Sequence, residues 1–167
     1  LFIGAKYEQR FGHVVLCGLR DIFVDVLRDE IGDEALYPPL HYRSKTLELA
    51  FTNTTRYNES FFSFVNGQYT SDGGTHLSAF REGLLKGVNE YAKAKYDGDE
   101  VRESIAGAIS IRIQEPQFEG QTKNKLGNTE IRSDLVARIK DIVEDLLHRN
   151  PEAADILVKK IEETRAV

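Results

Sequence analysis

The chain has no methionine, no tryptophan, one cysteine and only four prolines among its 167 residues. A lone Cys17 cannot form an internal disulfide, and such sparing use of cysteine fits a reducing cytoplasm. No apolar run approaches the roughly 20 residues that a membrane-spanning helix needs, and no charged-then-apolar leader indicates secretion. We therefore expect a cytoplasmic protein with no membrane contact.

Basic charge is also in short supply. The sequence has 22 Lys and Arg against 27 Asp and Glu, a net charge of −5. Because binding to nucleic-acid backbones depends on Lys and Arg displacing counterions, the whole chain is not a strong clamp for nucleic acid. Any DNA contact must come from a local basic patch or from another part of a larger protein.

Residue types that usually hold metals are scattered. With one cysteine and four isolated histidines we predict no metal site, and no nucleophile with a neighbouring base is evident. The histidines are His13, His41, His76 and His148. We expect His76 to be a packing or surface residue, because it follows a Gly-Gly turn at the start of a helix.

What is present suffices for one domain with a hydrophobic core, with 41% hydrophobic and 29% charged residues. Alternating apolar residues predict strands, and apolar residues spaced by three or four predict helices. The expected strands are 1–4, 12–17, 46–51, 60–65 and 104–113, and the expected helices are 18–30, about twenty residues from 75, 131–146, and a last one from 151. This order predicts an α+β domain with a mixed sheet and helices packed on one face.

Three local features refine that prediction. Turn-forming residues 53–58 favour a hairpin between strands 46–51 and 60–65. Thr75 is a candidate N-cap of the helix that follows Asp72-Gly-Gly. Asn150 is a candidate N-cap of the last helix, whose first position is Pro151.

The segment Phe118-Glu-Gly-Gln-Thr-Lys-Asn-Lys-Leu-Gly-Asn128 directly follows the apolar strand 104–113. In an extended segment alternate side chains lie on the same side, so Gln121 and Lys123 point together and Thr122 points away. An amide donor beside an ammonium group suits a phosphate oxygen. From the residues alone, a solvated surface loop remains an open interpretation.

Residues 118–126 resemble the "F-x-x-Q-T-K-x-K-L" loop of the ATPase subunits of type IIA DNA topoisomerases. A second block, residues 57–81, resembles the same family, with an "S-F-V-N" strand leading through "D-G-G-T-H" into a helix. The resemblance is strongest over residues 57–126 and extends from Cys17 onward. It implies the transducer domain that follows the ATP-binding domain in the B subunits of gyrase and topoisomerase IV.

This resemblance implies a fold like the second domain of ribosomal protein S5, with a left-handed βαβ crossover. Residues 17–167 would form the transducer domain, and residues 1–16 a remnant of the preceding ATPase domain or an N-terminal hairpin. Gln121 and Lys123 would bind the terminal phosphate of ATP held by the neighbouring domain, with Lys123 as the catalytic cation. Lys125 also matches the motif, but its role stays open.

The implied cofactor is ATP with Mg²⁺ in the full-length protein, with none in the isolated fragment, which we expect to be inactive. The implied partners are DNA, a topoisomerase A-type subunit and a second B subunit that dimerises on ATP binding. The family's ATP-binding motifs do not occur here, so we expect an excised piece. Where relatives often carry a basic residue before Asp72-Gly73, this chain has Ser71, which leaves direct DNA contact in doubt.

Two alternatives remain open. One is the second domain of a related ATPase of the mismatch-repair or chaperone type. The other is a free-standing S5-like module that binds nucleic acid or protein.

Overall fold

The computed structural model of the chain describes residues 27, 32–56, 58–120 and 124–165. Along these residues the elements are η1 (Gly32–Glu34), β1 (Leu40–Arg43), β2 (Leu47–Asn53), β3 (Ser60–Val65), β4 (Gln68–Tyr69), α3 (Thr75–Ala92), α4 (Gly98–Arg102), β5 (Ile105–Ile111), η2 (Thr129–Ile131), α5 (Arg132–Arg149) and α6 (Pro151–Arg165). The strands predicted at 1–4 and 12–17, the unit 1–16 and nearly all of the helix at 18–30 lie outside the described residues. Leu27, the exception, is helical and fully buried.

The described strands form one five-stranded mixed sheet in the order β1-β2-β5-β3-β4. β5 lies between β2, to which it is antiparallel, and β3, to which it is parallel. The predicted hairpin between strands 46–51 and 60–65 is therefore wrong, because both strands pair with β5. Alternating apolar residues indicate a strand but not its partner, and the nearly fully buried β5 takes the central place.

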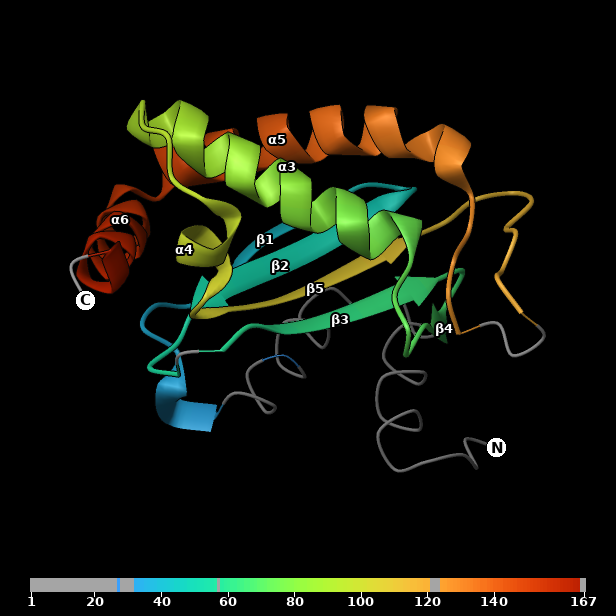
Figure 1. Cartoon of the computed structure of the whole chain (residues 1–167), viewed down its shortest axis with the longest axis horizontal. Coiled ribbons are helices and arrows are strands. Elements are labelled where there is room, and N and C mark those ends of the chain that lie inside the picture. Colours follow the sequence, from blue (N-terminus) through green and yellow to red (C-terminus); the bar gives the residue numbers. More distant parts are fainter. Residues whose placement is uncertain (1–26, 28–31, 57, 121–123, 166–167) are drawn as a thin grey trace.

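Helices cover one face of this sheet, where α3 and α5 lie side by side (Figure 1). The predicted α+β class with a mixed sheet is confirmed. In Figure 1, β3 and β5 point the same way, β5 lies above β3, and the connecting α3 passes in front of them. That arrangement gives the β3–α3–β5 crossover the left-handed sense that the resemblance implied, against the general preference for right-handed crossovers.

The contact between α3 and α5 is unusually close because two glycines face α5. A Cβ on Gly83 would lie 2.7 Å from the Ile139 side chain, and one on Gly87 would lie 2.8 Å from that of Val143. Ile139 and Val143 are themselves fully buried. The two helices therefore form a closely packed layer with no room for a side chain at either glycine, as expected of a close-packed interior.

α3 begins at a tight turn made possible by glycine. Gly73 and Gly74 both have positive φ, 71° and 118°, a backbone conformation that residues with a Cβ rarely adopt. The N-cap is Gly74 rather than Thr75, so the predicted cap is wrong. The Thr75 hydroxyl instead donates to the carbonyl of Leu126, 3.3 Å away, in a segment 51 residues later in the chain.

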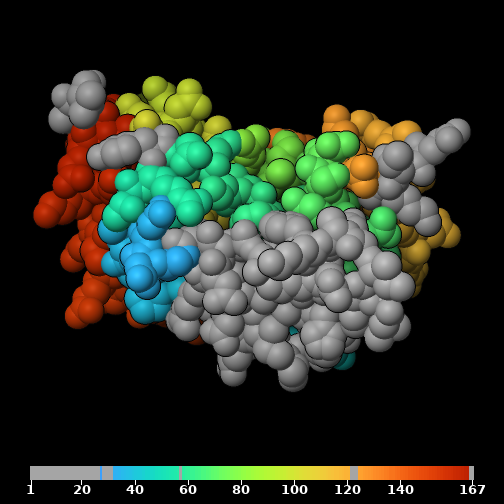
Figure 2. Space-filling view, turned by 90° about the horizontal axis from the view of Figure 1, so that it is seen from below, coloured from blue at the N-terminus to red at the C-terminus, as the bar shows by residue number. Residues whose placement is uncertain are grey.

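α5 passes into α6 through Asn150. The backbone N–H of Ala154 donates to the Asn150 carbonyl at 2.9 Å, so Asn150 holds the predicted position at the start of α6. Its side-chain amide, however, donates back to Leu146 at 2.8 Å and serves the end of α5. Residues 32–41 lie beside these C-terminal helices at one end of the molecule (Figure 2), where residues 36–41 line a groove with residues 149–153.

Candidate functional site

The two predicted site residues, Gln121 and Lys123, lie outside the described residues. The structure does describe both flanks of the segment between β5 and η2 that contains them, residues 118–120 and 124–128. We call residues 118–128 the 118–128 loop. These flanks show where the loop is attached.

The C-terminal flank of the 118–128 loop is held by the backbone at the start of α3. The N–H of Asp72 donates to the carbonyl of Asn124 at 2.9 Å, and the N–H of Thr75 donates to the carbonyl of Leu126 at 3.0 Å. In return, the N–H of Leu126 donates to the carbonyl of Gly73 at 3.0 Å. The loop and the turn before α3 thus pair like two short strands, and Leu126 itself is buried.

This pairing requires glycine at position 74. A Cβ there would lie 2.2 Å from the carbonyl oxygen of Leu126 and 2.4 Å from its nitrogen, distances that no side chain tolerates. The Gly-Gly that opens the helix is therefore a docking surface for the loop as well as a tight turn.

The loop also closes on itself. The N–H of Glu119 donates to the carbonyl of Lys125 at 2.8 Å, and the ammonium group of Lys125 lies 3.0 Å from the Glu119 carboxylate. Both side chains are about half exposed, so this ion pair adds little stability. It does turn Lys125, whose role the sequence left open, toward its own loop.

Asn128 ties the two ends of the loop together. Its buried side chain donates to the carbonyl of Glu115 at 3.2 Å and to the Glu130 carboxylate at 2.7 Å, and it accepts from the N–H of Gln117 at 2.5 Å. The hydrogen bond from Asn128 is the main reason that the pKa of Glu130 is lowered. Because both ends are fixed, the two described flanks of the loop, 118–120 and 124–127, start from a defined base.

A groove of about 630 Å³ runs along the outer side of α3 beside the loop. Its charged lining is mixed: Arg81, Arg102, Lys125 and Arg132 face Asp72, Glu82 and Glu119. Glu59 forms ion pairs with both Arg81 and Arg102. Burial, and then the neighbouring Arg102, lower the pKa of Arg81.

His76 lies beneath the start of α3 with no exposed surface. Its Nε2 is 3.0 Å from the hydroxyl of Thr70, which in turn is 2.7 Å from the hydroxyl of Ser63 on β3. Burial lowers the pKa of His76 to about 4, so the ring is neutral at pH 7. The packing role expected for His76 is confirmed, and this chain of polar groups joins α3 to β3.

Sequence reasoning missed three residues that position the loop: Gly74 as a contact surface, Asn128 as a tie, and Arg132 as a link to α3. Arg132 donates to Ser78 and Glu82, which lie 54 and 50 residues earlier in the chain. No local pattern could have revealed such distant partners.

Within the described ranges, no group of three or more His, Cys, Asp or Glu side chains is arranged to hold a metal ion. None of the helices in the described part of the chain is both long and apolar enough to cross a bilayer.

Comparison with known proteins gives a consistent result. The family model described as DNA gyrase B matches residues 18–166. The chain is 44% identical over 139 residues to the B subunit of DNA topoisomerase 4 from Borreliella burgdorferi, and 37% identical over 157 residues to the B subunit of DNA gyrase from Cytophaga hutchinsonii. These matches cover 83% and 86% of this chain but only 23% and 32% of the relatives, so the chain spans less than a third of their length.

Among solved structures, the chain is similar to the 43K ATPase domain of Thermus thermophilus gyrase B in complex with an aminocoumarin. The TM-score is 0.74 with 26% identity, over 84% of this chain and 42% of that one. The topoisomerase IV ATP-binding domain of Francisella tularensis matches with a TM-score of 0.67 at 23% identity, over 87% of this chain and 42% of that one, which shows the fold alone.

Proposed function

Because the chain belongs to the DNA gyrase B family, we propose that it is the transducer domain of a type IIA topoisomerase B subunit. In the intact protein it would couple ATP binding and hydrolysis to movement of a DNA gate. Residues 17–167 would form this domain, and residues 1–16 would be a remnant of the preceding ATPase domain or an N-terminal hairpin. The family match argues against the mismatch-repair, chaperone and free-standing alternatives.

In this proposal the nucleotide binds in a neighbouring ATPase domain, with Mg²⁺, and the 118–128 loop reaches it. Gln121 donates a hydrogen bond to the terminal phosphate, and the ammonium group of Lys123 stabilises the charge that develops on the transferred phosphoryl group. When that phosphate leaves, the two contacts are lost. Contacts that depend on a terminal phosphate are a common basis for nucleotide switches.

The single observation that carries the proposal is the pairing of the loop with the turn at residues 72–75. Three backbone hydrogen bonds connect Asn124 and Leu126 to the residues that begin α3. In this proposal, a movement of the loop therefore moves the start of α3. The close contact between α3 and α5 then carries that movement to α5. The isolated chain is expected neither to bind ATP tightly nor to hydrolyse it.

The partners follow from the same proposal. The intact protein would act in the cytoplasm on DNA with an A-type subunit, and would dimerise with a second copy of itself on binding ATP. The names of the relatives are consistent with such a complex.

Lys123→Ala in the intact protein tests the role of the loop. We expect ATP turnover to fall on the order of 100-fold, the usual cost of removing a group that stabilises transition-state charge, while nucleotide binding is partly kept. Steady-state ATPase assays and binding of a non-hydrolysable ATP analogue measure the two effects. Unchanged turnover would remove Lys123 from the mechanism.

Lys125→Ala is the matched control, since it removes an equal charge from the same loop. Lys125 pairs with Glu119, so its loss should change turnover by less than about fivefold, in line with an exposed ion pair. An equal loss of turnover in both variants would indicate a general effect of loop charge rather than a specific contact by Lys123.

A further inference from the structure

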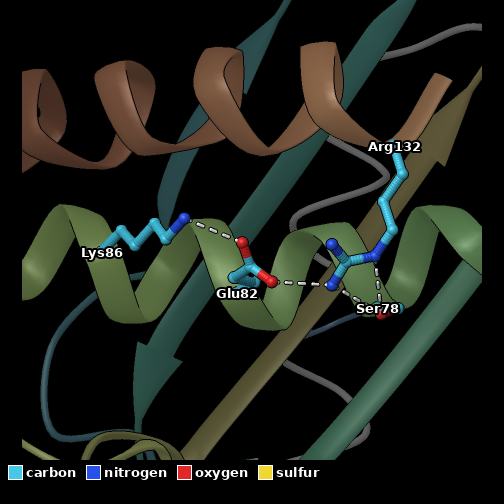
Figure 3. Close-up of polar contacts among 4 residues, drawn as sticks. All are labelled: Ser78, Glu82, Lys86 and Arg132. Atoms are coloured by element: carbon cyan, nitrogen blue, oxygen red, sulfur yellow. Dashed lines mark hydrogen bonds and ion pairs between the residues drawn. The ribbon is translucent and has the colours of Figure 1, made fainter.

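Arg132 joins the segment after the loop to α3. It is the first residue of α5 and follows Asn128 across the short η2 helix. Its Nη2 donates to the Ser78 hydroxyl at 3.1 Å and to the Glu82 carboxylate at 2.8 Å, and its Nε lies 3.3 Å from the same hydroxyl. Figure 3 shows the guanidinium reaching down from α5 to α3 to make these contacts. We call the three residues the Arg132 clamp.

The clamp and the loop share one surface. Arg132, Ser78 and Glu82 line the same groove as Glu119, Lys125 and Leu126 of the 118–128 loop. The described C-terminal flank of the loop is attached by the backbone at residues 72–75. The clamp attaches the start of α5, just beyond η2, about one to two helical turns further along α3. Two attachments fix the path of the chain from Asn124 to the start of α5, whereas one would leave it free to pivot.

The clamp contributes direction rather than stability. The side chains of Arg132 and Glu82 are 38% and 34% exposed, and ion pairs at such positions are typically worth about 1 kcal/mol or less. A guanidinium, however, holds two acceptors in a fixed fork, which sets an orientation that a lysine ammonium cannot. Glu82 is also shared with Lys86, 2.9 Å away on α3, and hydrogen bonds from Lys86 and then Arg132 lower the pKa of Glu82.

We propose that Arg132 is a positioning residue that aims the 118–128 loop at its phosphate by holding the start of α5 against α3. This inference rests on the proposed function, in which the loop contacts the terminal phosphate of ATP. Arg132 itself does not touch the nucleotide in this proposal. Its loss leaves the loop intact but misdirected, and small misplacements of reacting groups are costly to rate.

Arg132→Met in the intact protein tests this role, because methionine keeps much of the length and removes the fork. We expect kcat for ATP hydrolysis to fall on the order of 10-fold, with KM for ATP changing less than about threefold. Lys86→Met is the matched control: it removes the other cation on the same Glu82 carboxylate but does not touch α5. It should change kcat less than about twofold. Equal effects of the two variants on kcat would overturn the proposal, because the fall in kcat would then come from the changed charge around Glu82.

A second variant guards against a folding defect. Glu82→Gln weakens the same fork from the α3 side, and in an Arg132→Met background it should lower kcat no further, because both changes break one contact. Additive losses in the double variant would also overturn the clamp.

Failure of this inference and failure of the proposed function are distinguishable. If Lys123→Ala loses turnover and Arg132→Met keeps it, the positioning role is wrong and the function stands. If Lys123→Ala keeps turnover, the function is wrong, and an effect of Arg132→Met on kcat could not act through the loop.

Discussion

Along its buried side α3 packs on α5 through apolar side chains and two glycines, whereas its N-terminal end holds the 118–128 loop through backbone hydrogen bonds beside exposed ion pairs. In the first contact, Ile139 and Val143 are fully buried against the two glycines. The second consists of backbone hydrogen bonds, buried at Gly73, Thr75 and Leu126, beside partly exposed ion pairs. One helix thus combines a close-packed apolar interface with a polar one.

The helix–helix interface should be the more sensitive of the two to substitution. Gly87→Val places a branched side chain where even a Cβ would lie 2.8 Å from Val143 and 2.9 Å from the carbonyl of Lys140. We expect the free energy of unfolding to fall by about 3 kcal/mol, the upper range for overpacking. Urea unfolding of the 167-residue chain measures it.

Lys86→Val, at the exposed neighbouring position, introduces the same side chain without the clash and should cost about 0.5 kcal/mol. If Gly87→Val is no more costly than this control, the layer of α3 and α5 is looser than its geometry indicates.

The loop attachment should respond to Gly74→Ala. The new Cβ would meet the backbone of Leu126, and φ of 118° is itself strained for alanine. We expect a loss of about 2 kcal/mol in the free energy of unfolding, smaller than for Gly87→Val because only the loop and Leu126 lose contacts while the α3–α5 layer stays packed. Hydrogen exchange at the amides of Asp72, Thr75 and Leu126 should rise with it.

Gly120→Ala provides the control within the same loop. Gly120 also has positive φ, 75°, but nothing lies within 4 Å of its Cβ position. It should cost about 1 kcal/mol from backbone strain alone and leave exchange at Leu126 unchanged. Equal costs for the two glycines would mean that docking on Gly74 contributes nothing.

His76 makes the N-terminal end of α3 sensitive to pH. Its folded pKa of about 4 lies below the usual 6.5, so the unfolded chain binds the proton first as pH falls. The free energy of unfolding should therefore have its full value above pH 6.5 and decline as pH falls from 6.5 to 4. At pH 5.5 the loss should be about 1 kcal/mol. Urea unfolding at about pH 7.5 and about pH 5.5 measures the loss.

His76→Gln removes the titrating group and should flatten the profile in that window. The lowered pKa values of Glu82 and Glu130 act at more acidic pH, so they do not mask the difference. A variant with the same slope as the parent chain would show that His76 is protonated in the folded state.

Much of this architecture could be predicted from the sequence, because helix and strand patterns are local. Residues 60–65 form β3 as predicted, and the helices at 75 and 131 are present with small shifts of their ends. The pairing of strands depends on contacts far apart in the chain, so β5 was not expected between β2 and β3. Short strands were also not predicted. β1 and β4 have four and two residues, too few to show an alternating pattern of apolar side chains.

For the candidate site, too, local features could be predicted from the sequence and distant contacts could not. A motif of consecutive residues, such as the one with Gln121 and Lys123, can be read from the sequence, and their role stays a prediction. What holds that motif in place could not be read, because Gly74 and Leu126 are 52 residues apart, and Arg132 and Ser78 are 54. Thr75 illustrates the limit: its hydroxyl was assigned to its own helix, and the structure gives it to Leu126.

The central place of β5 has a mechanical consequence. The strand that leads into the loop is hydrogen-bonded along both edges, so the loop starts from the least movable line of the sheet, while its other end continues into α5 on the surface layer. A force on the loop would therefore move α5 more than β5. Under the proposed function, we expect nucleotide binding to tilt the helical layer of this domain over a stationary sheet.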